Sequence, residues 1–360
     1  MSERLIKLQD ELEKGRLLGP AIRPQDFLST GSTLLNLALS NRWDGGFLKG
    51  TYVLFVGDTD SGKTFICMTC LAEASINPEF DDYRFILMNK ERGMLMDVER
   101  FFGEGVASRL ELFYPENLED MYFELDDLLA EEQPFICVVD SIDALSTDYE
   151  AKKFEERKKG RRTGKAVAGD YGDGKAQLHS RNIRRVLSGL ERTKSIVIFI
   201  NQTRDLLDAN PYGPRSTHSG GRAISFYATM KIWSSVKGTI NKVYKDKKRQ
   251  IGIVSRIQVV RSRITGKRCE VEVPIYHSFG IDDVGSCVDY LVAEGHWKKS
   301  GGVIVAPEFE LKGQKETLVR KIEESDQEMA LRRLVGKVWK DIDEACKVTR
   351  KFRYARKSDE

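Results

Sequence analysis

Short runs of consecutive apolar residues recur along the first two thirds of the chain, and longer segments with helical spacing separate them. The runs are rich in β-branched and aromatic residues, which favour strands. Continuous apolar runs of this length are typical of strands buried on both faces, as in a parallel sheet covered by helices on either side. The predicted strands cover residues 52–56, 84–88, 110–114, 135–140 and 195–201.

The segment between the third and fourth runs predicts an amphipathic helix. Leu118, Met121 and Leu125 recur at helical spacing, and acidic residues take the remaining positions. Residues 115–133 carry eight acidic residues and no basic one. We interpret this acidic run as the solvated face of a helix and not as a metal site.

After residue 200 the pattern changes to strand-rich segments at 228–235, 253–260 and 269–276. A basic turn, KVYKDKKRQ, separates the first two segments. Strand-like segments that are joined in this way predict an antiparallel extension of the sheet.

The two ends of the chain predict smaller units. Residues 2–14 place apolar side chains near one helical face, and glycine and proline then end the pattern. Residues 326–352 again have a helical pattern, with a basic tail. We therefore divide the chain into an N-terminal helix and arm (1–30), an α/β core (31–282) and a small C-terminal α/β or helical region (283–360).

Two segments, 157–176 and 204–221, fit neither a helix nor a strand. The first is rich in glycine and basic residues, and the second contains two prolines and three glycines. Long loops in a compact domain are usually functional or disordered. Since each segment follows a predicted core strand, we interpret both as functional loops.

Composition limits the classes of protein that fit this pattern. With 360 residues and 41% hydrophobic side chains, the chain can bury one large core and a smaller appendage. The net charge of +3 is too small to indicate a nucleic-acid partner, but residues 151–165 carry eight basic residues against two acidic ones. No apolar stretch of about 18 residues occurs, and no signal peptide is recognisable, so we expect no membrane partner.

The six cysteines are scattered along the chain, which favours a reducing, cytoplasmic compartment. Cys67 and Cys70 have C-x-x-C spacing, but no second Cys or His pair follows at zinc-finger spacing. Both fall within a predicted helix. We therefore interpret them as packing residues.

The pattern G-x-x-x-x-G-K-T directly follows the first apolar strand and precedes a helical segment, the context that a phosphate-binding P-loop requires. Glycines let successive backbone N–H groups face the phosphates, and the helix N-terminus adds partial positive charge. Lys63 is expected to bridge the terminal phosphates of ATP, and the Thr64 hydroxyl to ligate Mg²⁺. The predicted nucleotide-binding residues are Gly57, Asp58, Thr59, Asp60, Ser61, Gly62, Lys63 and Thr64.

Carboxylates near two strand ends complete the predicted catalytic centre. Asp140 ends an apolar strand, where a carboxylate reaches the metal directly or through a water ligand. Glu91 follows the second strand and is placed to orient or deprotonate an attacking water. Asp97 and Glu99 lie on the same segment and remain alternatives for that role.

The fifth strand ends in Asn201 and Gln202, directly before the loop 204–221. A glutamine amide at this position is able to hydrogen-bond a γ-phosphate and to transmit its presence into the loop. Alternatively, the Asn-Gln pair simply caps the strand. We favour the first interpretation, which places Gln202 in the catalytic site with Glu91 and Lys63.

Several motifs, in this order, resemble those of the RecA family of ATP-dependent DNA recombinases. STGSTLLNLALSN at 29–41 resembles the segment that precedes the family's P-loop, and VVDSIDAL at 138–145 resembles its Walker B strand. IFINQTR at 198–204 and SGGRAISFYA at 219–228 resemble the flanks of its second DNA-binding loop. VVRSRI at 259–264 is similar to the strand with two basic residues that reach the neighbouring subunit's ATP.

The resemblance covers about residues 27–276, and residues 280–302 are similar to bacteriophage UvsX-type recombinases. The chain also departs from the family pattern. Asp58-Thr59-Asp60 fills the loop interior where bacterial members usually have Pro-Glu-Ser, and Asn89 stands where an aspartate is common. Neither departure removes a phosphate or metal ligand.

The resemblance implies a RecA-like P-loop NTPase core with a mainly parallel, twisted sheet. It implies a DNA-dependent ATPase that uses Mg²⁺, forms a helical filament on single-stranded DNA and exchanges strands with a homologous duplex. The N-terminal arm is then expected to dock on the next protomer, and Arg261 and Arg263 to complete that neighbour's ATP site. Mediator and single-strand-binding proteins are possible partners, in a bacterial or phage-infected cell.

Single-stranded DNA is expected to lie against the two glycine-rich loops. The basic segment 152–165 supplies charge for phosphate neutralisation, and tyrosines in the loops are able to stack on bases. The predicted DNA contacts are Lys175, Arg181, Arg204 and Arg222.

Two other functions remain as alternatives. A hexameric RecA-like helicase uses the same core in a closed ring, but the chain has no separate N-terminal domain of the size that such helicases carry. A non-catalytic paralogue binds ATP only as a structural ligand. The presence of Lys63, Thr64, Asp140, Glu91 and Gln202 disfavours this second alternative.

Overall fold

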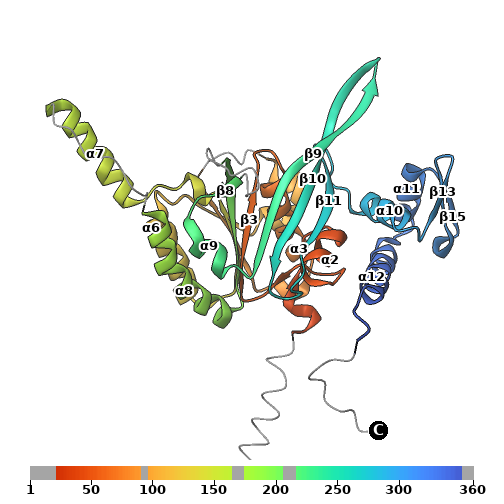
Figure 1. The fold of residues 1–360 in the computed structure, drawn as a ribbon, viewed down its shortest axis with the longest axis horizontal. Coiled ribbons are helices and arrows are strands. Elements are labelled where there is room, and N and C mark those ends of the chain that lie inside the picture. Colours follow the sequence, from red (N-terminus) through yellow and green to blue (C-terminus); the bar gives the residue numbers. More distant parts are fainter. Residues whose placement is uncertain (1–21, 91–95, 164–173, 206–215, 351–360) are drawn as a thin grey trace, which may run out of the picture.

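The computed structural model describes residues 22–90, 96–163, 174–205 and 216–350 (Figure 1). A ten-stranded sheet lies at its centre. Its strands are β3 (Thr51–Gly57), β4 (Arg84–Asn89), β5 (Leu110–Phe113), β6 (Phe135–Asp140), β7 (Ile196–Asp205), β8 (Ser216–His218), β9 (Met230–Tyr244), β10 (Lys247–Ser262), β11 (Cys269–Tyr276) and β12 (Gly280–Ile281).

The sheet has a parallel half and an antiparallel half. The strand order is β12-β11-β10-β9-β3-β7-β6-β4-β5, with β8 paired to β7. Neighbours from β9 through β3 to β5 run parallel, whereas β9, β10, β11 and β12 pair antiparallel. All five predicted core strands are present, and the expected α/β fold with an antiparallel extension is confirmed.

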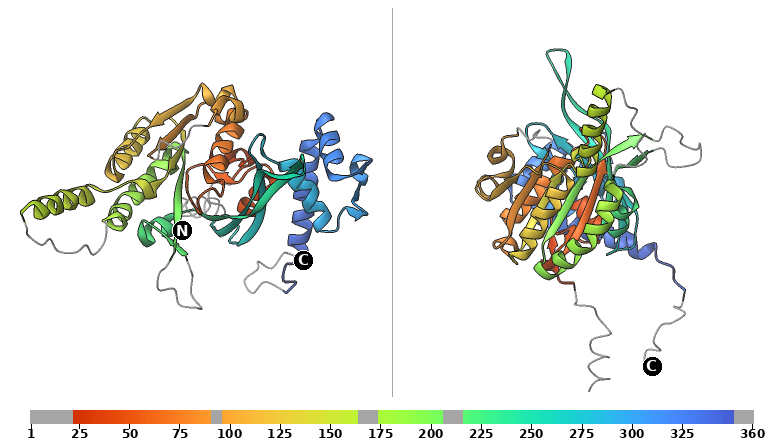
Figure 2. Two further views of the ribbon diagram at one scale, coloured as in Figure 1. Left: turned by 90° about the horizontal axis from the view of Figure 1, so that it is seen from above. Right: turned by 90° about the vertical axis from the view of Figure 1, so that its left-hand side faces the viewer.

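Helices cover both faces of the sheet (Figures 1 and 2). Alternate residues of β3 point to opposite faces: Val53 and Phe55 join one buried cluster, and Leu54 and Val56 join the other. The first cluster includes α2 (Thr33–Ser40) and α3 (Lys63–Ser75), and the second includes α6 (Leu118–Ala130), α8 (Lys175–Thr193) and α9 (Gly221–Tyr227). Smaller elements complete the core, namely β1 (Phe27–Leu28), β2 (Phe47–Leu48), α4 (Val98–Phe102) and α5 (Glu104–Ala107).

The acidic helix predicted between the third and fourth strands is α6. Its apolar residues, Leu118, Met121 and Leu125 among them, are buried against the sheet. Asn117 caps its first turn by accepting a hydrogen bond from the Asp120 N–H at 2.7 Å. No group of three or more potential metal ligands occurs in the described part of the chain, and the acidic residues lie on the outer side of a packed helix.

The first glycine-rich segment differs from the expectation. Residues 157–163, which we expected to lie in a loop, belong to α7 (Asp148–Thr163), and this helix projects from the body of the molecule (Figure 1). Residues 164–173 lie outside the described part. The helix has no apolar face to signal it, but it is rich in Glu, Lys and Arg, which favour helices.

The second predicted loop, 204–221, is shorter than expected, because strands and a helix include residues at both of its ends. Strand β7 continues to Asp205, and β8 pairs with it antiparallel in the register Thr203 with His218. Helix α9 then begins at Gly221. Residues 206–215 lie outside the described part.

The C-terminal region contains both helices and a sheet. Its elements are α10 (Asp283–Ala293), β13 (Lys298–Ser300), β14 (Val303–Ala306), β15 (Leu311–Gly313), α11 (Lys315–Glu324) and α12 (Glu328–Ala345). The expected helix at 326–352 is therefore present as α12, and the three strands form a small antiparallel sheet.

A buried carboxylate joins this region to the core. Asp283 accepts hydrogen bonds from Thr33 N at 2.6 Å and Thr33 Oγ1 at 2.8 Å, and it pairs with Arg332 at 2.9 Å. Residues 1–21 of the predicted N-terminal arm (1–30) lie outside the described part. None of the described helices is both long and apolar enough to span a membrane.

Candidate nucleotide-binding site

The carboxyl ends of four strands bring the predicted site residues to one edge of the sheet. Gly57, the last residue of β3, lies opposite Gln202 of β7. Asn89 of β4 lies opposite Asp140 of β6. Ligands bind at this edge in open α/β sheets, because loops and helix N-termini gather there. The structure therefore unites segments that are far apart in the sequence.

The P-loop has the backbone that tight wrapping requires. Gly62 has φ +87° and directly precedes α3, and a Cβ built on it would lie 2.5 Å from Ile275 Cδ1. A Cβ on Gly57 would lie 2.0 Å from Ser234 Oγ. Both positions therefore need glycine, for conformation or for space. The loop ends at the N-terminus of α3, a helix of 13 residues whose first N–H groups point toward the loop.

Serines on the neighbouring strands β9 and β10 form hydrogen bonds to the P-loop. Ser61 Oγ lies 2.7 Å from Ser234 Oγ on β9, and Ser255 Oγ on β10 donates to Ser61 O at 2.7 Å. Asp58 N also donates to Ser234 O at 3.1 Å. Sequence reasoning missed Ser234 and Ser255, because no local pattern signals a contact to a loop far away in the sequence.

Lys63 lies inside the loop, with only 8% of its surface exposed. Its ammonium group donates to Gly57 O at 2.9 Å and to Asp58 O at 2.6 Å. These contacts hold the positive charge at the concave side of the loop, where the terminal phosphates of a nucleotide would lie. Phosphate oxygens are charged and accept stronger hydrogen bonds than carbonyl oxygens. The lysine is thus positioned for the phosphate-binding role that its motif predicts.

Thr64 and Asp140 meet at the mouth of the loop. Thr64 Oγ1 donates to Asp140 Oδ2 at 2.5 Å. A hydroxyl and a carboxylate are oxygen ligands of the kind that Mg²⁺ prefers beside nucleotide phosphates. The two predicted metal ligands therefore come together, although they are far apart in the sequence, and the donor set fits Mg²⁺.

Gln202 and its neighbour Thr203 lie beside the loop. Gln202 is opposite Gly57 in the β3–β7 register, so its side chain starts within one strand spacing of the P-loop. Thr203 Oγ1 donates to Asp58 Oδ1 at 2.5 Å. Asn201 is buried, and its Nδ2 donates to Ser219 O at 3.1 Å. The strand end is therefore bonded both to the P-loop and to the residues that precede α9.

Glu91, the predicted catalytic base, lies outside the described residues. Of the two alternatives, Asp97 is the N-cap of α4, and its Oδ1 accepts a hydrogen bond from Arg100 N at 3.1 Å. Glu99 lies in the first turn of the same helix and is exposed. Asp97 therefore has a structural role in capping α4, and the role of Glu91 stays a prediction.

Arg261 and Arg263 lie together, far from the P-loop of their own protomer. Arg261 Nη1 donates to Ser225 O at 2.7 Å, and Arg263 Nη2 donates to Phe226 O at 2.5 Å, both near the C-terminal end of α9. Along β10, Arg261 is six residues beyond Ser255, which contacts the P-loop. Six residues of a strand span about 20 Å. Neither guanidinium is therefore placed to reach a nucleotide in its own subunit.

A third cation, Lys231, joins this arginine pair. Lys231 lies opposite Arg261 in the β9–β10 register, and its Nζ donates to Ser225 Oγ at 2.8 Å. Burial, together with the positive charge of the nearby Arg261, lowers the pKa of Lys231 to about 8. The sequence analysis missed this residue, because Lys231 lies among apolar strand residues without any motif.

The predicted DNA contacts differ in how far their side chains are exposed. Arg222 is exposed at the start of α9, and Arg181 is exposed on α8. Arg204 belongs to β7, and its side chain lies outside the described set. Lys175 differs from the expectation, since it is only 6% exposed and its Nζ donates to Asp143 O at 3.2 Å. Lys175 thus anchors the start of α8, and we leave it out of the proposed DNA contacts.

The cysteines of the C-x-x-C segment are both buried in α3. Burial raises the pKa of the Cys67 thiol and of the Cys70 thiol, so each is held protonated. Cys70 Sγ donates to Ile66 O within the helix at 3.2 Å. These contacts are those of packing residues.

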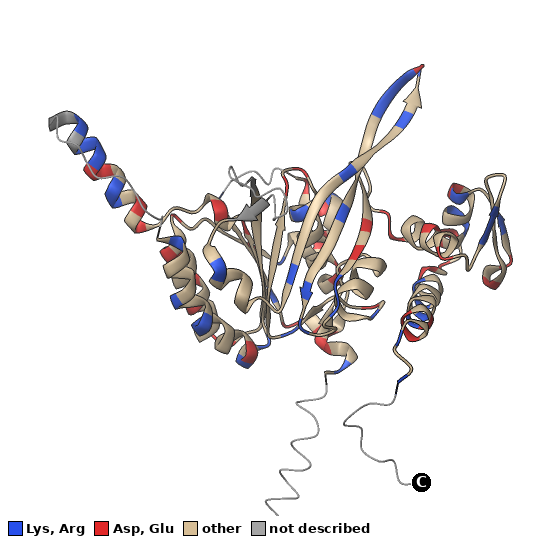
Figure 3. Cartoon of the chain, viewed as in Figure 1, with Lys and Arg blue, Asp and Glu red and all other residues tan. Residues whose placement is uncertain are grey.

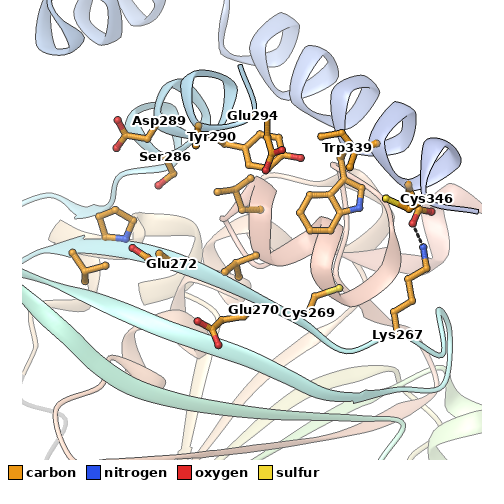
Figure 4. A pocket seen from close by; sticks show the side chains of 17 residues that line it. Lys267, Cys269, Glu270, Glu272, Ser286, Asp289, Tyr290, Glu294, Trp339 and Cys346 are labelled. Atoms are coloured by element: carbon orange, nitrogen blue, oxygen red, sulfur yellow. Dashed lines mark hydrogen bonds and ion pairs between the residues drawn. The ribbon is translucent and has the colours of Figure 1, made fainter. Parts of the chain in front are cut away.

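A cavity of about 690 Å³ lies elsewhere, between the C-terminal region and β11 (Figure 4). Tyr290 and Trp339 line it together with carboxylates such as Glu270 and Glu272, and an ion pair of Lys267 with Asp343 crosses one end. None of the predicted nucleotide-binding residues lines this cavity. It is therefore separate from the P-loop site.

Comparison with known proteins accounts for this combination of fold and site. The family model of the RecA N-terminal domain matches residues 14–282. Protein RecA of Thermus thermophilus is 27% identical over 341 residues, which cover 90% of this chain and 89% of that protein. Protein RecA of Chlorobium limicola is 27% identical over 313 residues, which cover 82% of this chain and 78% of that protein. Protein RecA of Lactococcus lactis subsp. cremoris is 28% identical over 310 residues, which cover 84% of this chain and 73% of that protein. With a P-loop, a Walker B aspartate and a parallel core in place, and a family match over most of its length, the chain belongs to the RecA family.

Proposed function

We propose that this RecA-family recombinase is a DNA-dependent ATPase that forms a helical filament on single-stranded DNA and exchanges strands with a homologous duplex. The observation that carries the proposal is the meeting of the P-loop, Asp140 and Gln202 at one sheet edge, with Thr64 and Asp140 2.5 Å apart. The family match supports the same reaction. The narrower likeness of residues 280–302 to phage UvsX-type recombinases stays a prediction.

The proposed parts of Lys63, Thr64, Asp140 and Gln202 are supported by their positions, and that of Glu91 by its place in the sequence. Lys63 binds the terminal phosphates and stabilises the charge that develops on them. Thr64 and Asp140 would hold Mg²⁺, which would neutralise phosphate charge when bound. Glu91 orients or deprotonates the attacking water. Gln202 bonds the γ-phosphate from the end of β7.

The pairing of β7 with β8 connects Gln202 to the proposed DNA-binding segment. The segment 206–215 joins these two strands, and Thr203 and Arg204 lie at its base. A side chain at the end of β7 that engages or releases a phosphate shifts the base of that segment, as in switches that couple a γ-phosphate to a loop. Arg222 and Arg181, with the basic surface of α7, supply further charge for the DNA backbone.

Assembly supplies the remaining part of the ATP site. We propose that the N-terminal arm, residues 1–30, docks on the next protomer, and that Arg261 and Arg263 enter that neighbour's nucleotide site. Guanidinium groups held at a transferring phosphate from a second subunit act as arginine fingers do. The location of the pair, remote from its own P-loop, supports a role in trans.

A strand-exchange assay tests the proposal. Circular single-stranded DNA and a homologous linear duplex are incubated with the protein, and the joint and product molecules are separated on a gel. We expect products only with ATP and Mg²⁺ and only with homologous DNA. The Lys63→Ala protein should form none, because charge stabilisation of the transferred phosphoryl group is lost.

Two outcomes would favour the other functions. Duplex unwinding that needs no homology would indicate a helicase. Tight ATP binding without DNA-stimulated hydrolysis would indicate a non-catalytic paralogue.

A further inference from the structure

One edge of the central sheet, the outer side of β11, is open along most of its length. β11 pairs with β10 through all eight of its residues, but β12 pairs only with Ile275 and Tyr276. No strand lies beside the outer side of residues 269–274 in the described part of the chain. We call this stretch the free edge. Such an edge presents a row of backbone N–H and C=O groups that are ready to pair with another extended segment.

A hydrogen bond at the end of the free edge shows which backbone groups face outward. Pro274 O accepts from Asp282 N at 3.0 Å, and Asp282 directly follows β12, which lies on the outer side. Successive residues of a strand direct their backbone groups to opposite neighbours. The N–H and C=O groups of Glu270 and Glu272 therefore point outward, away from β10.

The free edge forms one wall of the cavity of about 690 Å³, and the helices α10 and α12 form another (Figure 4). The rings of Tyr290 and Trp339 lie there with their centroids 5.9 Å apart. Trp339 donates its indole N–H to Asn41 Oδ1 at 2.9 Å, so its polar atom is satisfied and the ring offers apolar surface. Protein interiors have few voids larger than a water molecule, whereas cavities of several hundred Å³ are typical of binding sites.

The lining of the cavity is acidic, and acidic positions recur along β11 (Figure 3). Lys267 is the single cation among the described residues that line it. Several of the carboxylates form ion pairs that are largely exposed, and such pairs contribute little to stability, so their partners are easily exchanged. A cationic segment is therefore the occupant that the lining favours. The five lining carboxylates are those of Glu270, Glu272, Asp289, Glu294 and Asp343.

The chain itself contains a segment with the matching pattern. Residues 351–357, KFRYARK, which we call the tail segment, lie outside the described part and follow α12 after a short connection. The tail segment has four basic residues and no acidic one. Basic and aromatic residues alternate over its first four positions, so an extended conformation would place the two kinds on opposite faces.

The end of α12 brings the tail segment to the cavity. Cys346, the residue after α12, lines the cavity, and Asp343 in the last turn of α12 forms an ion pair with Lys267. Lys267 lies two residues before β11, so α12 ends beside the Cys269 end of the free edge. Seven extended residues span about 23 Å, and the six residues of the free edge span about 20 Å. Position, length and charge of the tail segment thus all match the free edge.

We propose that the tail segment binds along the free edge of its own chain as an added strand, with its aromatic side chains against Tyr290 and Trp339 and its basic side chains toward the carboxylates. In strand addition, backbone hydrogen bonds supply affinity and side-chain pockets supply specificity. The added strand would join the C-terminal region to the core at a second place, besides the contact of Asp283 with Arg332. The inference is independent of the proposed function, because it involves neither nucleotide nor DNA.

The thiol of Cys269 reports whether the free edge is covered, because it is half-buried and lines the cavity. All proteins in the test carry Cys346→Ser, which leaves Cys269 as the one cysteine that is not buried. The rate at which N-ethylmaleimide labels Cys269 is measured by mass spectrometry, without nucleotide or DNA. The full-length protein is compared with a protein that ends at Arg350.

Two matched variants of the full-length protein complete the comparison. Phe352→Ala/Tyr354→Ala removes both aromatic side chains of the tail segment. The control, Tyr149→Ala/Phe154→Ala, removes two exposed aromatic side chains from α7, which projects from the opposite side of the molecule (Figure 1). If the truncated protein fails to fold by circular dichroism, the comparison of these two variants decides the question.

We expect truncation to speed the labelling of Cys269 about tenfold, because a thiol that is covered about nine-tenths of the time reacts only while it is uncovered. Phe352→Ala/Tyr354→Ala should give most of this increase, and the control variant should give none. Raising the salt concentration from about 0.05 to 0.5 M should speed labelling of the full-length protein only, since salt screens the attraction between the tail segment and the carboxylates.

A synthetic peptide with the sequence KFRYARK should restore slow labelling to the truncated protein. A short tether gives the tail segment an effective concentration of about 1 mM, so tenfold protection corresponds to a dissociation constant of about 0.1 mM for the free peptide. The peptide KRKRFYA has the same composition and charge without the alternation, and it should restore none of the protection.

Three results would overturn the inference. Equal labelling rates in the full-length and truncated proteins, or in the two full-length variants, would show that the tail segment does not cover the edge. Protection that appears only at high protein concentration would show that it covers a second copy of the chain instead. Equal protection by both peptides would show that charge alone attracts the segment, without strand addition.

Discussion

Thr203 Oγ1 donates a hydrogen bond to Asp58 Oδ1 at 2.5 Å, so the end of β7 is tied directly to the phosphate-binding loop. The partner carboxylate belongs to the loop interior, at a position where bacterial members of the family usually have proline. A proline has no side-chain acceptor for this bond. The hydrogen bond therefore gives this chain an additional link between its nucleotide site and the strand that leads to residues 206–215.

The first prediction concerns this link. Thr203→Val keeps the shape of the side chain but removes the hydroxyl, so we expect ATP binding to change by less than about threefold. The factor by which ATP strengthens single-stranded DNA binding should fall about five- to tenfold. Hydrogen bonds to charged groups are worth about 1.5–3 kcal/mol when buried, and this bond is exposed and therefore worth less. Anisotropy titrations with and without ATP measure the ratio. Thr203→Ser is the control, and a Val variant with the wild-type ratio would argue against coupling through this bond.

The second prediction distinguishes the catalytic carboxylate. Glu91→Gln should reduce ATP turnover by about 10²-fold or more while nucleotide and DNA binding survive, because the amide cannot take up a proton. Asp97→Asn should leave turnover near the wild-type level, since asparagine is as good an N-cap for α4 as aspartate. Steady-state phosphate release measures both. The opposite pattern, with Asp97→Asn inactive and Glu91→Gln active, would show that the base has been assigned wrongly.

The third prediction tests whether Arg261 and Arg263 act in trans. The Arg261→Ala/Arg263→Ala protein and the Lys63→Ala protein should each be inactive in ATP hydrolysis. Mixed together on DNA, they should recover part of the activity, because some interfaces then join an intact P-loop to an intact arginine pair. Native mass spectrometry confirms that the two proteins co-assemble. No recovery at any mixing ratio, despite co-assembly, would place the pair outside the neighbour's ATP site.

The fourth prediction follows from the lowered pKa of Lys231. Its folded-state pKa is about 8, against 10.5 for an ordinary lysine, so between these values the unfolded chain binds a proton that the folded protein does not. The free energy of unfolding should therefore rise as pH increases from about 8 to 10.5. Because the group is only half-buried, we expect a rise of about 1–2 kcal/mol, less than the full shift would give.

Urea unfolding at pH 8 and at pH 10 measures this contribution. Lys231→Met should lose the rise relative to wild type, because the titrating group is gone. Lys237→Met, which removes an exposed lysine from the same strand, should retain it. Equal pH dependence in wild type and Lys231→Met would show that Lys231 does not titrate in this range.

The sequence predicted those features that depend on local pattern. The core strands are continuous apolar runs, such as the one that ends in Asp140, and their burial on both faces makes the pattern visible. The P-loop and the carboxylate of Asp140 are likewise set by short motifs in a strand context. Their meeting, with Thr64 2.5 Å from Asp140, follows once both strands are placed in one parallel sheet.

Features without a local pattern were not predicted. Helix α7 has no buried apolar face, so a search for apolar periodicity treats its C-terminal half as a loop. The contacts of Ser61 with Ser234 and Ser255 join residues 173 and 194 positions apart, respectively. The anchoring role of Lys175 depends on burial against Asp143 O, which composition cannot reveal. The sequence alone does not decide whether the C-terminal region is α/β or helical, because its small sheet begins with Lys298–Ser300, a strand with every residue exposed and so without alternation.

Electron microscopy of the protein on single-stranded DNA with a non-hydrolysable ATP analogue tests the central claim most directly. The account predicts long helical filaments that coat the DNA, that require the nucleotide, and that are absent for Lys63→Ala. Closed rings of fixed subunit number would contradict it, because the same subunit interface would then close on itself as in a hexameric helicase.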